Sequence, residues 1–204
     1  MESIFFCIVN SIFVIFLMVT IVDIVLIGFP IIKYDRILEK KTFLITRPNY
    51  SEIQGRVECS AFASAYVYRH LEKAVKGLEL YKEMPCKSSK GYVYCKGIVK
   101  LARKYGFYAC FHTGNLNALK NTVAKGIPVI VMIHSNPHSR FLHYIVVVGY
   151  DAENIYAIDS AANLRNVNNE YYNRIIPIKE FKKLWNVSLI KQPLYFNLFF
   201  EIHK

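Results

Sequence analysis

The sequence predicts an α+β domain that follows one transmembrane helix. The first 22 residues include a long run without charged side chains, which is typical of a membrane span. In the remaining chain, helical patterns come mostly first and strand patterns mostly later, which favours α+β over a layered α/β fold. The chain of 204 residues is long enough for one compact domain with its own core, and it contains no internal repeats.

The N-terminal segment is predicted to be a retained transmembrane helix within residues 1–32. Ser3 to Val22 are free of charge and consist mainly of Ile, Phe, Val and Leu, and about 20 such residues span a bilayer as a helix. A cleaved signal peptide is less favoured because no basic region precedes the run and no small-x-small cleavage site follows it. Asp23 is expected at the membrane interface, and a functional carboxylate within the membrane is the alternative.

The distribution of charge predicts the orientation of this helix. Of the net charge of +11, the first 32 residues contribute −2 through Glu2 and Asp23, so the remainder carries +13. Basic residues follow the span directly and none precedes it, so the positive-inside rule places the domain in the cytoplasm of a single-pass membrane protein. We expect residues 33–47 to be a linker and residues 48–204 to form the domain. The basic side chains are scattered and accompany no nucleic-acid-binding motif, so a nucleic-acid partner is not predicted.

Gln54 and Cys59 introduce the first helix of the domain. Apolar residues recur at near-helical spacing after Cys59, which predicts a helix over residues 60–76 that ends at Gly77. A thiol at a helix N-terminus lies among unpaired N–H groups and the positive end of the dipole, which favour the thiolate. Cys59 is therefore a candidate nucleophile, with the Gln54 amide as a nearby hydrogen-bond donor.

The following elements are predicted in chain order from periodicity, caps and breakers. They are a short extended piece at 42–46, a loop at 79–91, a helix at 94–105, a strand at 107–112, a helix at 115–125, a strand at 129–134, an Asn-rich loop at 163–173, a helix at 177–186 and a strand at 195–202.

A predicted hairpin carries the candidate base and its partner. His143 opens a buried-strand pattern that runs to Tyr150, residues 151–154 form a tight turn, and residues 154–159 return. In an antiparallel pair, His143 and Asp159 can then lie side by side. A cysteine nucleophile needs such a base and a group that orients the base.

Gln54, Cys59, His143 and Asp159, in this order, resemble the papain-type cysteine peptidases. The resemblance is closer to the bacteriocin-processing peptidases that cut after double-glycine leaders, and to their stand-alone relatives. In that family a Gln precedes the Cys at the start of a central helix, and a His-Tyr/Phe-hydrophobic-Val-Gly-Tyr strand leads to an Asp after a short turn. The resemblance covers about 51–185 and has one departure, Ser60, where many relatives have Gly.

The resemblance implies a membrane-anchored cysteine peptidase with a papain-like domain. Cys59, His143 and Asp159 would form the triad, and Gln54 would donate to the oxyanion. A peptide or protein is the implied substrate, no cofactor is implied, and a neighbouring transporter is a possible partner because the chain itself has no transporter helices. An acyltransferase using the same thioester chemistry and a catalytically silent, membrane-tethered peptide-binding module remain as alternatives.

The other histidines and cysteines fit these roles less well. His134 and His138 compete with His143 for the role of base, but no carboxylate follows them at hairpin spacing. The five cysteines include no Cys-x-x-Cys pair, so reduced thiols are expected. Cys110 and His112 share one strand face, where Cys86 or Cys95 might join them, but no metal site is predicted without a further ligand.

Overall fold

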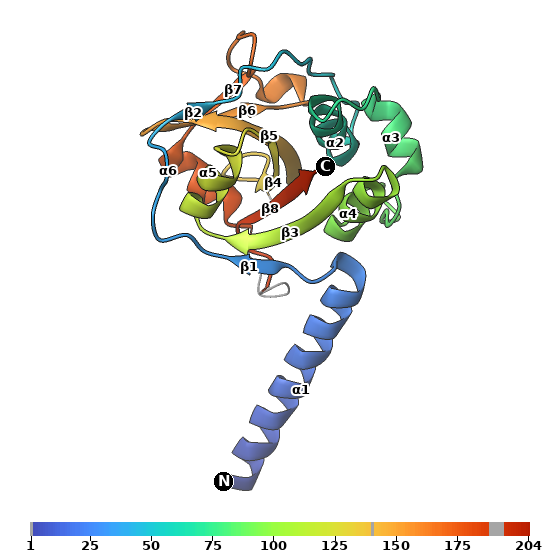
Figure 1. The fold of residues 1–204 in the computed structure, drawn as a ribbon. Helices are drawn as coiled ribbons and strands as arrows, with labels where there is room; N and C mark the ends of the chain where they lie inside the picture. Colours follow the sequence, from blue (N-terminus) through green and yellow to red (C-terminus); the bar gives the residue numbers. More distant parts are fainter. Residues whose placement is uncertain (1, 140, 188–193) are drawn as a thin grey trace.

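The computed structural model describes residues 2–139, 141–187 and 194–204. It consists of a long N-terminal helix and a domain of helices and strands, called the body below (Figure 1). Helix α1 (Glu2–Ile27) projects from the body in Figure 1, with its N-terminus far from the sheet. The body combines a sheet of eight strands with helices on both of its faces, as expected for an α+β fold.

The sheet is almost entirely antiparallel. Its order is β1-β3-β8-β4-β5-β6-β7, with β2 paired to the far end of β5, and only the β1–β3 pair is parallel. The strands are β1 (Ile31–Lys33), β2 (Phe43–Leu44), β3 (Tyr108–Gly114), β4 (Val129–His134), β5 (Leu142–Tyr150), β6 (Asn154–Ile158), β7 (Arg174–Pro177) and β8 (Leu198–His203).

Helices cover the sheet from two sides. Helices α2, α3 and α4 lie on one side in Figure 1, and α5 and α6 lie on the other. Their bounds are α2 (Cys59–His70), α3 (Gly77–Glu83), α4 (Cys95–Lys104), α5 (Leu116–Val123) and α6 (Ile178–Trp185), and a short 3-10 turn, η1, spans Ala162–Leu164. Asn115 caps α5 as predicted, because its Oδ1 accepts the N–H of Ala118 at 2.9 Å.

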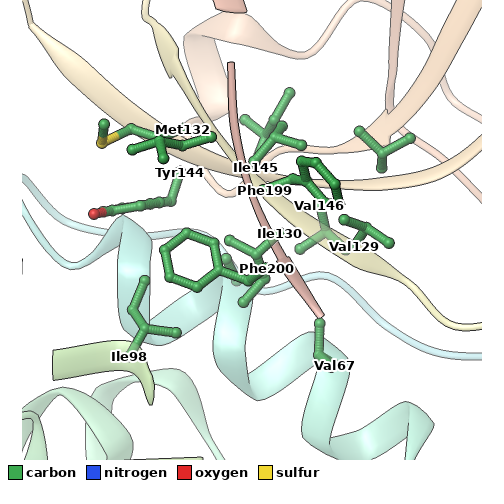
Figure 2. Close-up of a cluster of buried hydrophobic side chains, with 14 of the residues drawn as sticks. Val67, Ile98, Val129, Ile130, Met132, Tyr144, Ile145, Val146, Phe199 and Phe200 are labelled. Atoms are coloured by element: carbon green, nitrogen blue, oxygen red, sulfur yellow. The ribbon is translucent and has the colours of Figure 1, made fainter. Parts of the chain in front are cut away.

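The core between α2, α4 and the sheet is built from aliphatic and aromatic side chains. Figure 2 shows Val67 of α2 and Ile98 of α4 beside Phe200 of β8. Phe199, the preceding residue of β8, points to the opposite face and contacts Trp185 of α6. Alternation along β8 therefore gives the sheet two apolar faces, and helix α2, which begins at Cys59, packs on one of them.

Helix α2 is shorter than predicted, and the prediction of a loop over residues 79–91 is wrong in its first part. The helix ends at His70, and Glu72 follows with a left-handed φ of 69°. Gly77 does not end α2 but begins α3, where the Glu52 carboxylate accepts its N–H. A Cβ at Gly77 would lie 2.7 Å from the Phe62 ring, so this glycine permits close packing of α3 on α2.

Strand β1 joins the end of α1 to the sheet. Only residues 28–30 separate α1 from β1, and β1 pairs with β3 from Ile31 to Lys33. This pairing requires Gly114, because a Cβ there would lie 2.2 Å from the carbonyl oxygen of Lys33. Neither β1 nor β7 was predicted, whereas β2 falls within the predicted extended piece at 42–46.

Helix α1 is the one helix in the described ranges that is long and apolar enough to cross a membrane. The apolar stretch Phe5–Ile27 has 23 residues, and the part of it that could span a membrane is not buried against the body. A signal sequence near an N-terminus meets the same criteria, so length and composition alone support both readings.

Candidate active site

Cys59 is the first residue of α2. The turn before it is held by the Glu58 carboxylate, which accepts the N–H groups of Arg56 and Val57 at 2.7 and 3.0 Å. Because Glu58 uses its side chain in this turn, it does not cap the helix. The first N–H groups of a helix have no intrahelical acceptor, so the Cys59 N–H is available beside its own thiol.

Ser60, the departure from the family pattern, faces the interior. Its side chain is 1% exposed and is not among those that line the cleft. The extra side chain therefore occupies the core side of α2, away from the surface that a substrate would approach.

The β5–β6 hairpin brings His143 and Asp159 together. His143 is the second residue of β5, and Asp159 directly follows β6. A register shift between Val147 and Gly149 bends the pair, and the His143 Nε2 lies 2.8 Å from the Asp159 Oδ1. This contact leaves Nδ1 as the ring nitrogen that is available to the Cys59 side chain.

The Asp159 carboxylate is fully buried and has several partners. Arg174 of β7 donates to Oδ2 at 2.7 Å, and the Ala161 N–H donates to Oδ1 at 2.8 Å. Burial raises the pKa of Asp159, but the interaction with His143 and these further donors outweigh it, so the pKa lies below its usual range. The carboxylate is therefore held ionised beside the imidazole.

The backbone of Asp159 is also fixed. The Asn173 side chain accepts the Asp159 N–H at 2.7 Å and donates to its carbonyl oxygen at 3.0 Å. Arg165 donates to the same carbonyl at 2.9 Å. The loop after β6 is thus held by β7 and by the Asn-rich segment before it.

His143 is held in its charged form. Burial lowers the pKa of the imidazolium, but hydrogen bonds and charge interactions with Asp159 and Cys59 more than compensate and raise the pKa to about 10. A charged imidazole near a thiol is a feature of sites where cysteine acts as a nucleophile.

Gln54 is tied to the residue that follows Asp159. The Gln54 Oε1 accepts the Ser160 hydroxyl at 2.7 Å, and the Gln54 N–H donates to the Ser160 carbonyl at 3.0 Å. Because the amide oxygen is occupied, the NH₂ group is the end of the side chain that remains for another acceptor.

A cleft of about 560 Å³ lies over the four predicted site residues, and three of them line it. Gln54, Cys59 and His143 line it, whereas Asp159 lies beneath, behind His143. The loop 54–57 forms one wall, and residues 161–164 and 135–136 with Phe141 and Leu142 contribute the rest.

A second, apolar pocket of about 100 Å³ adjoins the cleft. It shares Val57, Cys59, Tyr92 and Leu142 with the cleft. Its other lining residues include Tyr195 and Ile27, the last residue of α1. The end of the N-terminal helix and the candidate nucleophile therefore border one cavity.

The structure brings together all four predicted site residues and separates the competitors. His134 ends β4 and His138 is exposed in the next loop, and in the described part of the chain neither lines the cleft. Ser160, Asn173 and Arg174 were not predicted to belong to the site. Asn173 ends the predicted Asn-rich loop, and Arg174 begins β7, a strand that was not predicted.

The chain matches the Peptidase C39 like family over residues 35–189, which is more than half of its length. No curated protein matches it significantly. The matched range includes every residue of the cleft described above.

Solved structures with this fold come from the same class of peptidase. A C39-like peptidase from Bacillus anthracis is 16% identical, with a TM-score of 0.62 and coverage of 81% of this chain and 98% of that one. The peptidase domain of Streptococcus ComA, a bifunctional ABC transporter of a quorum-sensing pathway, is 18% identical, with a TM-score of 0.58 and coverage of 74% and 96%.

A third similar structure contains a peptide. It is a double-glycine motif protease from an AMS/PCAT transporter in complex with the leader peptide, 19% identical, with a TM-score of 0.54 and coverage of 78% and 96%. At these identities the likeness shows the fold, and the family match over residues 35–189 shows the family. The chain therefore belongs to the Peptidase C39 like family and has the fold of a cysteine peptidase.

Proposed function

We propose that this protein is a membrane-anchored cysteine peptidase that hydrolyses peptide bonds with Cys59, His143 and Asp159. The observation that carries the proposal is the buried His143–Asp159 contact of 2.8 Å. His143 and Cys59, which begins helix α2, both line a cleft of about 560 Å³. A thiol, an imidazole and a carboxylate in this order are the groups that nucleophilic catalysis by cysteine requires.

The proposed reaction begins with attack of the Cys59 thiolate on the carbonyl carbon of the substrate. The Cys59 N–H and the Gln54 NH₂ group stabilise the negative oxygen of the tetrahedral intermediate. The His143 imidazolium gives its proton to the leaving amine as the C–N bond breaks, and a thioester remains. Water, deprotonated by His143, then attacks the thioester and releases the carboxylic acid and the thiol.

Asp159 keeps the imidazole oriented and compensates its charge. Its second oxygen is bound to Arg174, so the carboxylate stays ionised throughout the cycle. Arg174 and Asn173 are positioning residues in this proposal, because they act on Asp159 and not on the substrate.

The substrate class and partner follow from the similar proteins. One of them is in complex with a leader peptide, and another is a domain of an ABC transporter. We propose a peptide substrate for this chain and a separate transporter beside it. We further propose that residues 1–32 anchor it in the membrane, that residues 33–47 connect the anchor, and that the domain over 48–204 lies in the cytoplasm.

The test uses the full chain purified in detergent, incubated with synthetic double-glycine leader peptides and with a mixed peptide library. Mass spectrometry should find new carboxyl termini with the wild type and none with Cys59→Ala. Cys86→Ala is the matched control, because Cys86 is a free, partly exposed cysteine outside the cleft. Iodoacetamide should label Cys59 rapidly at pH 5, and His143→Ala should slow this labelling at least tenfold.

Two outcomes favour the alternatives. If added amines divert the product from hydrolysis to amide formation, the protein is an acyltransferase. If peptides bind without any cleavage and labelling of Cys59 is indifferent to His143, the protein is a silent binding module.

A further inference from the structure

A second group of ionisable side chains lies on β3 and β8, away from the cleft. Cys110 and Glu201 are direct partners in the antiparallel β3–β8 pair, and His112 is two residues along the same face of β3. The Cys110 Sγ lies 3.2 Å from the His112 Nε2, which lies 3.3 Å from the Glu201 Oε2. The three donor atoms fall within 4.8 Å of one another.

These donors are held in place by the sheet. Cys110 and His112 are buried, and the His112 ring stacks on Phe199 with centroids 5.0 Å apart. The stacking keeps Nε2 directed at Cys110 and Glu201. The Glu201 side chain is 14% exposed, so the group is open to solvent on one side.

Two of the separations between donor atoms are close to those in a tetrahedral metal site, and the third is at most 4.8 Å. Zinc bonds of about 2.0 to 2.3 Å at tetrahedral angles separate neighbouring ligand atoms by about 3.3 to 3.6 Å. The observed separations of 3.2 and 3.3 Å are close to these values. One thiolate, one imidazole and one carboxylate form a ligand set that zinc and cobalt accept, with water as the fourth ligand.

The ammonium groups of two lysines balance the charge of the Glu201 carboxylate. Lys33 of β1 lies 2.7 Å from Glu201, and Lys125 lies 3.3 Å from it. Both ammonium groups stand on long side chains that reach solvent, so they can leave when a divalent ion enters. They compete with that ion, and removal of Lys33 should therefore strengthen metal binding.

We propose that Cys110, His112 and Glu201 form a binding site for one divalent ion of the zinc class. Because the ligands come from two neighbouring strands, the ion would fasten the C-terminal strand β8 to β3. This site is independent of the proposed peptidase reaction, since in the described ranges none of its ligands lines the cleft.

The test titrates Co²⁺ into the full chain in detergent. The Cys59→Ala variant is the background, so that the Cys59–His143 pair cannot supply a thiolate. One Co²⁺ per chain should produce a thiolate-to-cobalt band in the near ultraviolet and tetrahedral bands in the visible, and one Zn²⁺ should remove them. Zn²⁺ should also raise the melting temperature of this variant.

Added Cys110→Ala or Glu201→Gln should abolish or weaken the bands, and Cys86→Ala should leave them unchanged. Lys33→Met should lower the apparent Kd for Co²⁺ at least threefold. Glu201→Gln retains the side-chain volume, so it serves where Cys110→Ala does not fold. Absence of the bands, their persistence in both ligand variants, or weaker binding in Lys33→Met would overturn the proposal and leave an ion-pair network.

Discussion

Asp159 and Ser160 are neighbours in the chain, and each contacts a different residue that lines the cleft. Asp159 contacts the His143 imidazole, and Ser160 holds Gln54 through its hydroxyl and its carbonyl oxygen. The backbone at this step is fixed by Asn173. One dipeptide therefore sets the distance between the proposed base and the proposed oxyanion donor.

Ser160 should matter only through Gln54. We expect Gln54→Ala to lower kcat about a hundredfold, because one oxyanion donor is lost. Ser160→Ala should cost about tenfold, because it frees the amide to rotate without removing the donor. In the double variant the Ser160 effect should vanish, which a double-mutant cycle of kcat measures.

Ser160→Thr is the control, since it keeps the hydroxyl and should restore most of the turnover. Additive losses in the double variant would show that Ser160 acts on another part of the site.

The raised pKa of His143 makes stability depend on pH. The imidazolium has a pKa of about 10 in the folded chain, against about 6.5 when unfolded. Its stabilising effect is therefore complete below about pH 6.5, declines as pH rises and is lost above about pH 10. Thermal unfolding of the full chain in detergent should show this decline, and His143→Gln should flatten it. Parallel curves for the two proteins would contradict the assignment.

The β5–β6 hairpin is the element that assembles the base and its carboxylate. Its turn is held by Asp151, whose Oδ1 accepts the N–H groups of Glu153 and Asn154 at 2.8 and 2.6 Å. The Tyr156 hydroxyl donates to the other carboxylate oxygen. The turn is at one end of the hairpin, and His143 and Asp159 are at the other.

We expect Asp151→Ala to reduce stability by about 2 kcal/mol, because two backbone hydrogen bonds to a charged group are lost. Turnover at a permissive temperature should change less than about twofold, since register in the middle of the hairpin is set by buried side chains. Chemical denaturation and kcat measure the two effects. Tyr156→Phe removes one donor only and should cost about 1 kcal/mol; a loss as large as that of Asp151→Ala would refute this account of the turn.

Elements with their own local signals were predictable from the sequence. β4 has the predicted bounds, and the hairpin with its Asp151 turn was confirmed. In the hairpin, the apolar strand pattern and the turn-forming residues indicate the same structure. The end of α2 was wrong because Glu72 takes a left-handed φ that a glycine usually supplies, so the signal at Gly77 was read as the stop.

The contacts beneath the candidate site were not predictable in the same way. The proximity of Gln54, Cys59, His143 and Asp159 follows from motif order and hairpin geometry. The buried ion pair between Arg174 and Asp159 depends on β7 lying beside β6, with Arg174 opposite Ala157. A strand of four residues that begins with an arginine carries no such signal by itself.

At the scale of the whole molecule, α1 is attached firmly to the body. The Lys96 Nζ donates to the Val25 carbonyl at 2.5 Å, and the Tyr195 hydroxyl donates to the Gly28 carbonyl at 2.7 Å. Together with the three-residue connection to β1, these contacts make the helix an extension of the sheet.

We expect the full chain to remain in the membrane fraction after extraction with alkaline carbonate, with residues 1–27 retained in its intact mass. Because basic residues follow α1, protease should spare the domain in intact cells and digest it in inverted vesicles. A mature chain that lacks the helix would identify a signal sequence instead. Digestion from outside intact cells would overturn the cytoplasmic placement.

Because Ile27 and Cys59 line one pocket, the end of α1 lies close to the candidate nucleophile. As the proposed membrane anchor, α1 would hold the cleft at a nearly constant height above the lipid surface, because its end is hydrogen-bonded to the body. A substrate tethered in the same bilayer would be cut at a bond set by this height, whatever its sequence beyond the cleft. The helix would then determine how far from the membrane a tethered substrate is cut.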